Sequence, residues 1–149
     1  METLIVKGHT KLSGKIKVGG AKNVAMKVLL CGLLTDEPIS VGNIPLISSV
    51  YGTAEILRHL GVKISIKKDH TVRIQGDGKG NFTVPLILGG LYRTATMVIG
   101  PLLARFGRAI VPNPGGCRLG MRPIDQHIKG LCALGAKIEY KEGYFKLLF

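Results

Sequence analysis

The chain repeats a short sequence at a distance of 74 residues. Residues 57–64 read LRHLGVKI and residues 131–138 read LCALGAKI, so that five of the eight positions are identical. Upstream of each copy, residues 41–43 (VGN) and 111–113 (VPN) also correspond, at an offset of 70 residues. Duplicated units of this length each need a neighbour against which to bury an apolar face. We therefore predict two similar α/β units packed together, although Leu-x-x-Leu-Gly is also a common way for a helix to end.

Hydrophobic spacing predicts the same order of elements in both parts of the chain, namely helix, strand, helix, strand, strand. In the first part these elements are expected over residues 21–34, 38–41, 48–60, 62–67 and 72–75. In the second part they are expected over residues 89–105, 108–111, 123–134, 136–140 and 144–148. Two further strands are expected near the N-terminus, at residues 4–6 and 14–18. We predict mixed sheets with helices packed on one face.

The charge of the chain limits the classes of ligand. Its 21 Lys and Arg against nine Asp and Glu give a formal net charge of +12. A positive field of this size attracts nucleic acids, acidic lipids and phosphorylated metabolites alike. Only 5% of the residues are aromatic and Trp is absent, which leaves few rings on which bases could stack. A nucleic-acid partner is therefore not expected.

The cellular compartment is indicated by the absence of membrane, signal and disulfide patterns from the sequence. No stretch reaches the ~18 consecutive apolar residues of a membrane helix, and the first residues have no apolar signal core. The three cysteines, Cys31, Cys117 and Cys132, form no CxxC pair of the kind that marks a zinc site or a disulfide framework. We expect a cytoplasmic protein with neither a membrane partner, a metal nor a cofactor.

A glycine pair precedes the first predicted helix, in the sequence Gly19-Gly20-Ala21-Lys22-Asn23. Such a junction brings backbone N–H groups and the positive end of a helix close to an anion. Lys22 adds a mobile charge, and Asn23 adds a donor and an acceptor. The stretch is neither a Walker loop nor a dinucleotide fingerprint. An anion site and a plain Gly-Gly turn with a solvated lysine both fit it.

A second stretch, PNPGGCRLGMRPID at residues 112–125, carries a cysteine in an unusual setting. Its prolines and glycines exclude regular helix or strand, so Cys117 is expected on a loop. The neighbouring Arg118 and Arg122 favour a thiolate, which suits proton transfer or nucleophilic attack. Cys31 and Cys132 lie among leucines in predicted helices, where we expect them to be buried and unreactive.

Together these stretches resemble the UDP-N-acetylglucosamine 1-carboxyvinyltransferase family of enolpyruvyl transferases. The resemblance rests on GAKN (20–23), LLTDEPISVGNIP (33–45), LRHLGVKI (57–64) and PGGCRLGMRPIDQHIKGLCALGAKI (114–138), and it covers essentially the whole chain. It implies repeated βαβαββ units in an inside-out α/β barrel, with two domains of three units each and the substrates in the cleft between them.

By this resemblance the chain is an N-terminal part that holds about two of the three units of one domain. Unit one would span residues 21–80 and unit two residues 81–149, while residues 1–20 would be strands of the far domain. The general base would then lie outside this chain, so we expect the isolated chain to be a poor catalyst. Its uncovered flank predicts self-association.

The resemblance also implies a reaction, the transfer of an enolpyruvyl group from phosphoenolpyruvate to the 3-hydroxyl of UDP-N-acetylglucosamine, which begins peptidoglycan synthesis. Cys117 would act as general acid and as the site of fosfomycin alkylation. Lys22 and Arg122 would hold phosphoenolpyruvate, Asn23 would contact the amino sugar, and Arg93 would bind anionic groups of the substrates. The end of the site that takes UDP would be lined by Arg122, Pro123, Ile124, Asp125 and His127.

Two other functions fit the same residues. The sister enzyme of the family uses shikimate 3-phosphate as acceptor, but it is not expected to carry the cysteine loop. Alternatively, the chain could bind a UDP-sugar or phosphate without turnover, since the general base would be missing.

Overall fold

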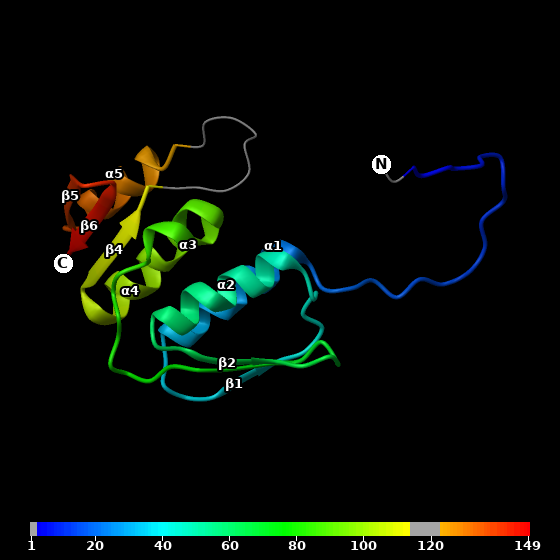
Figure 1. Ribbon diagram of the computed structural model, residues 1–149, viewed down its shortest axis with the longest axis horizontal. Helices are drawn as coiled ribbons and strands as arrows, with labels where there is room; N and C mark the ends of the chain where they lie inside the picture. Colours follow the sequence, from blue (N-terminus) through cyan, green and yellow to red (C-terminus); the bar gives the residue numbers. More distant parts are fainter. Residues whose placement is uncertain (1–2, 114–122) are drawn as a thin grey trace.

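In a computed structural model of the chain, residues 3–113 and 123–149 are described, and they form two α/β units in tandem (Figure 1). Unit one contains α1 (Lys22–Leu29), the 3-10 helix η1 (Leu30–Leu33), β1 (Ile39–Val41), α2 (Ser48–His59), β2 (Lys63–Ile66) and β3 (Val72–Gln75). Unit two contains α3 (Leu86–Leu91), the 3-10 helix η2 (Arg93–Val98), α4 (Ile99–Phe106), β4 (Arg108–Pro112), α5 (Asp125–Ala133), β5 (Lys137–Lys141) and β6 (Tyr144–Leu148).

The two sheets share one topology. Their strand orders are β1-β3-β2 and β4-β6-β5, so in each unit the last strand lies between the other two. In unit one Ile74 of β3 pairs with Ile39 on one side and Ile64 on the other. The equivalent row in unit two is Ala109, Leu147 and Ile138. The predicted repetition of the element order is confirmed, and the structure shows that the strand order repeats as well.

The predicted mixed sheets need a correction. Every neighbouring pair of named strands is antiparallel, because the second strand of each hairpin occupies the place beside the first strand of its unit. Parallel pairing occurs, within the described residues, at the bridge between Thr83 and Ile110 of β4. Backbone hydrogen bonds from Val84 N–H to Ile110 O and from Ile110 N–H to Phe82 O hold this short segment against β4.

One hydrophobic core runs through both units. Buried Leu57 of α2 and Ile74 of β3 belong to the same cluster as Leu102 of α4 and Leu147 of β6. On β3 the buried Val72 and Ile74 alternate with exposed Arg73 and Gln75, as expected for a sheet with one face toward its helices. The units are therefore fixed against each other by shared apolar burial.

Arg105 of α4 adds a polar link between the units. Its guanidinium donates a hydrogen bond to the Leu33 carbonyl oxygen at the end of η1 (3.3 Å) and forms an ion pair with Asp36. It also lies 5.0 Å from the centre of the Phe106 ring. The Arg105 side chain is only 19% exposed, so solvent screens these contacts less than those of a surface pair.

Replacing Arg105 with methionine keeps the packing of the stem and removes the guanidinium. We expect the free energy of unfolding to fall by about 1 to 2 kcal/mol, the range for lost hydrogen bonds to a charged group when one partner is exposed. Urea unfolding measures this change. Arg73→Met, on the exposed face of β3, is the control and should change stability by less than about 0.5 kcal/mol. Equal losses in both variants would refute the proposed link.

Two predicted elements differ from the structure. The single helix expected over residues 89–105 is divided into α3, η2 and α4, with Tyr92 extended (φ −126°, ψ 118°) between α3 and η2. Pro101 explains the 3-10 geometry before it, because its ring would clash with the Met97 carbonyl in a continuous α-helix and it has no N–H to donate.

The N-terminal strands are the second difference. Residues 3–20 form neither strand nor helix, and they lead away from the body of the molecule (Figure 1). Leu4 and Ile16 are almost fully exposed. A strand requires a partner for its backbone groups, and the described residues provide none at this place. No helix among the described residues is long and apolar enough to span a membrane.

Candidate functional site

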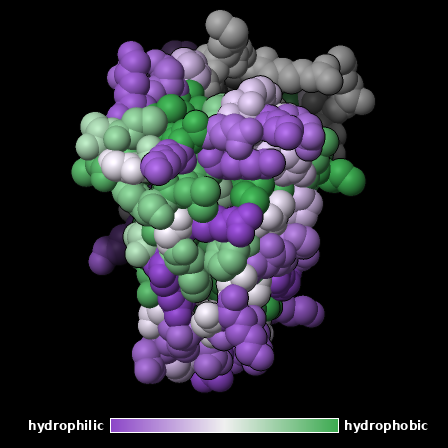
Figure 2. Space-filling model, turned by 90° about the vertical axis from the view of Figure 1, so that its left-hand side faces the viewer, coloured by the Kyte–Doolittle hydropathy of each residue, from purple (hydrophilic) through white to green (hydrophobic). Residues whose placement is uncertain are grey.

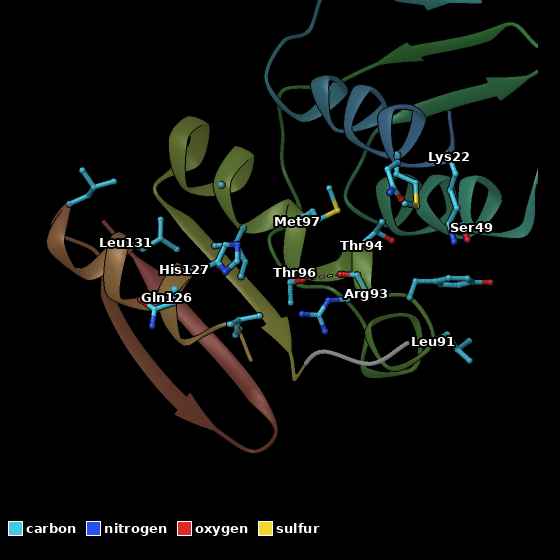
Figure 3. Close-up of a pocket in the computed structure, with 18 residues that line it drawn as sticks. Lys22, Ser49, Leu91, Arg93, Thr94, Thr96, Met97, Gln126, His127 and Leu131 are labelled. Atoms are coloured by element: carbon cyan, nitrogen blue, oxygen red, sulfur yellow. Dashed lines mark hydrogen bonds between the residues drawn. The ribbon is translucent and has the colours of Figure 1, made fainter. Parts of the chain in front are cut away.

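The two units meet at a cavity of about 810 Å³. Its walls come from α1, the start of α2, the segment from the end of α3 into α4, and α5 (Figure 3). A volume of this size suits a small-molecule ligand. Because α1 and α2 belong to unit one and the other elements to unit two, the cavity exists only when both units are packed together.

Unit one contributes Lys22 and Asn23, the first two residues of α1. The helix begins after Ala21, which is extended, and no side chain caps it. The preceding Gly20 lies so close to the neighbouring loop that an added Cβ would stand 1.7 Å from the Asn43 carbonyl oxygen. Glycine is therefore required for the chain to enter α1 at this place. Lys22 and Asn23 consequently stand at an uncapped helix start with positive polarity.

Unit two contributes Arg93, the first residue of η2. Its carbonyl oxygen accepts a hydrogen bond from the Thr96 hydroxyl (2.8 Å), and the preceding Tyr92 ring lies against Gly52 of α2. Figure 3 shows Arg93 beside Thr96, between Lys22 on one side and His127 on the other. The cavity thus has cationic groups from both units.

The third wall is α5 and the residue before it. Ile124 is buried and lines the cavity, followed by the exposed Gln126 and His127. Pro123 and Asp125 are not among the lining residues; Asp125 accepts a hydrogen bond from the Gln126 side chain (3.0 Å).

Of the residues singled out in the sequence, the structure brings five around one cavity. They are Lys22, Asn23, Arg93, Ile124 and His127. Pro123 and Asp125 lie next to them in the chain without lining the cavity. Cys117 and Arg122 fall outside the described residues. Their roles stay predictions.

Several lining residues were not predicted from the sequence. Six of them are apolar, namely Met26, Leu91, Met97, Ile99, Leu131 and Leu134. In the sequence these side chains follow helical spacing and are indistinguishable from core residues. Ser49 also lines the cavity, and its place in the first turn of α2 was available from the predicted helix start. The resulting cavity pairs cationic groups with apolar walls, which fits a ligand that has anionic and apolar parts.

A carboxyl with a clearly lowered pKa lies elsewhere in the described chain. The Thr71 N–H donates a hydrogen bond to Asp69 (2.9 Å), which favours the charged carboxylate and holds the pKa of Asp69 below its usual value. Asp69 belongs to the turn between β2 and β3 and does not line the cavity.

Cys132 is exposed, so the prediction that it is buried is wrong, whereas Cys31 is half-buried. The reason is that α5 has no fully buried residue and turns Cys132 toward solvent. We expect an alkylating reagent to modify Cys132 faster than Cys31, as measured by peptide mass mapping of native protein. Faster modification of Cys31 would contradict this exposure. That Cys117 reacts ahead of both stays a prediction.

Comparisons with known proteins agree on one family. A family model described as EPSP synthase (3-phosphoshikimate 1-carboxyvinyltransferase) matches residues 6–149. The UDP-N-acetylglucosamine 1-carboxyvinyltransferase of Halorhodospira halophila is 42% identical over 146 residues, covering 98% of this chain and 35% of that protein. The protein of the same name from Serratia proteamaculans is 41% identical, covering 98% and 34%. The chain thus spans about a third of the length of these curated relatives.

Solved structures show the same fold. The enolpyruvyl transferase NikO from Streptomyces tendae superposes with a TM-score of 0.75 at 19% identity, covering 95% of this chain and 31% of that one. EPSP synthase from Acinetobacter baumannii gives a TM-score of 0.66 at 22% identity, covering 91% and 32%. At these identities the comparison concerns the arrangement of helices and strands.

Proposed function

The chain belongs to the EPSP synthase (3-phosphoshikimate 1-carboxyvinyltransferase) family, and from this premise we propose that it serves enolpyruvyl transfer from phosphoenolpyruvate to the 3-hydroxyl of UDP-N-acetylglucosamine. The observation that carries the proposal is the cavity between the units. There Lys22 and Asn23 of unit one share a cavity with Arg93 and His127 of unit two, although Lys22 and His127 are 105 positions apart in the sequence. Both substrates are anionic, and cations from two sides can hold them with charge-assisted hydrogen bonds.

Each side chain has a proposed role in this reaction. Lys22 holds phosphoenolpyruvate, and its charge stabilises the negative charge of the phosphate group, which leaves as inorganic phosphate after the acceptor hydroxyl has added to the enol carbon. Asn23 binds the amino sugar through its amide, which can both donate and accept. Arg93 binds the anionic groups of the substrates.

The remaining roles belong to the segment before and within α5. Ile124 and His127, with Pro123 and Asp125 beside them, receive the uridine end of the acceptor. Cys117 delivers a proton to the methylene carbon of phosphoenolpyruvate as general acid, and Arg122 holds the phosphate. A thiol among arginines is suited to that proton transfer because its pKa is readily adjusted.

The acceptor is proposed to be a UDP-sugar because the relatives named for that acceptor share 42% and 41% identity with this chain. EPSP synthase from Acinetobacter baumannii shares 22%. Shikimate 3-phosphate is the second candidate, since the family model carries the name of the enzyme that uses it.

Isothermal titration calorimetry with UDP-N-acetylglucosamine and with shikimate 3-phosphate tests the choice of acceptor. We expect saturable binding of the UDP-sugar at least about tenfold tighter than that of shikimate 3-phosphate. Tighter binding of shikimate 3-phosphate would assign the other acceptor. Phosphate release in the presence of both substrates separates a transferase from a binding module without turnover.

Self-association and location complete the proposal. Unit two leaves apolar side chains exposed, namely Leu134, Tyr140, Leu148 and Phe149. On the side of the molecule where unit two lies, apolar surface is visible between polar groups (Figure 2). Exposed apolar surface of this kind supports association through the flank of unit two. Because the proposed acceptor is a nucleotide sugar, we propose that the activity takes place in the cytoplasm, where it begins peptidoglycan synthesis.

A further inference from the structure

Two buried threonines connect the cavity wall from unit one with the cavity wall from unit two. The Thr53 hydroxyl of α2 donates a hydrogen bond to the Ser49 carbonyl oxygen (2.8 Å) and shares a hydrogen bond with the Thr94 hydroxyl of η2 (3.2 Å). Thr53 is 1% exposed and Thr94 6%. Among the described residues they are the buried polar side chains of the core. This bond joins residues 41 positions apart, one from each unit.

Both ends of this connection reach the cavity. Ser49, whose carbonyl oxygen accepts the hydrogen bond from the Thr53 hydroxyl, lines the part of the cavity that unit one contributes. Thr94 directly follows Arg93 and lines the part that unit two contributes. Figure 3 shows Thr94 between Ser49 and Arg93. The hydrogen bonds therefore run behind the cavity from one wall to the other.

The other neighbour of Arg93 is anchored to the same helix. A Cβ added to Gly52 would lie 2.3 Å from the Tyr92 ring, so this ring packs directly on the backbone of α2. Tyr92 therefore contacts Gly52 of α2, and Thr94 is hydrogen-bonded to Thr53, the next residue of that helix. Between them, the Arg93 carbonyl oxygen accepts a hydrogen bond from the Thr96 hydroxyl. Arg93 has neighbours on both sides that are held by unit one.

We propose that Thr53 and Thr94 are a positioning pair that holds Arg93 at the correct distance from Lys22 for both to bind one anionic ligand. This inference rests on the proposed function for the identity of the ligand, but the placement of Arg93 can be tested without it. Charge-assisted contacts depend steeply on geometry, so a backbone that is free to shift weakens binding without touching a charge.

A set of four variants separates positioning from stability. Thr53→Val leaves the buried Thr94 hydroxyl without its partner, which destabilises the fold. The double variant Thr53→Val with Thr94→Val replaces both partners by groups of the same shape, which is nearly neutral for stability. Thr53→Ser retains the hydroxyl. Thr83→Val, outside the lining of the cavity, is the matched control.

Three measurements are made on every variant. The first is the dissociation constant for UDP-N-acetylglucosamine, by calorimetry, and the second is the midpoint of urea unfolding. The third is the ¹⁵N order parameter of the Arg93 side-chain Nε–H, assigned by the loss of its signal in Arg93→Lys. The NMR measurement needs no ligand.

If the pair positions Arg93, the double variant keeps the midpoint of the original chain but binds the UDP-sugar about three- to tenfold more weakly, and its Arg93 order parameter falls. Thr53→Ser and Thr83→Val should bind normally. The proposal is overturned if the double variant has unchanged affinity and an unchanged Arg93 order parameter. If the original chain binds no UDP-sugar, the proposed function fails for this chain, and the NMR result alone decides the inference.

Discussion

Replacing Leu60 with alanine is expected to lower the free energy of unfolding by about 2 to 4 kcal/mol, whereas Leu134→Ala should change it by less than about 0.5 kcal/mol. The two leucines occupy the same position of the sequence repeat. Each follows the last turn of a helix and precedes a glycine with positive φ, Gly61 at 93° and Gly135 at 104°. Yet Leu60 is 2% exposed and Leu134 is 74% exposed.

The difference in exposure arises because unit two packs against the end of α2, whereas no described element packs in the same way against the end of α5. Leu60 belongs to the core cluster that also contains Val84 and Leu102 of unit two. The Asn81 side chain further donates a hydrogen bond to the His59 carbonyl oxygen at the same helix end (3.2 Å). Removing three carbons from Leu60 therefore leaves a cavity, while Leu134 loses contacts mainly with water.

Urea unfolding of both variants, monitored by far-ultraviolet circular dichroism, measures the two changes. Similar losses in the two variants would show that Leu134 is covered in solution. In that case the midpoint of the original chain should rise with protein concentration, because association stabilises the folded form. A concentration-independent midpoint with similar losses would contradict the described packing of α5.

The second large effect is expected at the cationic groups of the cavity. Lys22→Ala and Arg93→Ala should each weaken binding of UDP-N-acetylglucosamine or phosphoenolpyruvate by about ten- to a hundredfold, the range for a lost hydrogen bond from a charged donor. Lys22 stands at the uncapped start of α1 in unit one, and Arg93 stands in the part of the wall that unit two contributes. Both side chains should act on one ligand, since they line one cavity.

Matched controls come from the same chain. Lys27 lies in the last turn of α1 and Arg108 on β4, and neither is among the residues that line the cavity. Lys27→Ala and Arg108→Ala remove the same charges and should change affinity less than about twofold, because neither side chain lines the cavity and solvent screens exposed charges at physiological salt. If all four variants weaken binding equally, the ligand responds to net charge and the assigned site is wrong.

Much of the secondary structure could be predicted from local patterns. The helix at 48–60, the hairpin of β2 and β3, and the final two strands follow directly from spacing and turn residues, and they lie within about a residue or two of the observed bounds. The helix expected at 89–105 failed because apolar spacing continues through Tyr92, where the backbone is extended, and through the 3-10 segment that precedes α4. The strands expected at 4–6 and 14–18 failed because a strand is defined by its partner.

The candidate site was only partly accessible to sequence reasoning. Lys22 and Arg93 carry charge in a glycine-rich or apolar context and could be singled out by resemblance. Met26 and Met97 could not, since nothing local distinguishes a cavity wall from a core face. The Thr53–Thr94 contact joins two ordinary threonines that only tertiary packing brings together.

The repeated unit is already specified by local features of the amino-acid sequence. The eight-residue repeat, the glycine after each helix and the alternation along the strands predict the same element order twice, whereas the strand order and the antiparallel pairing are visible only in the structure. Which copy of a repeated leucine is buried, and which residues share a cavity, depends instead on the packing of the two units. The physical reason is that periodicity and turn chemistry act within a few residues. Burial, and the placement of Lys22 and His127 around one cavity, instead require contacts between whole units.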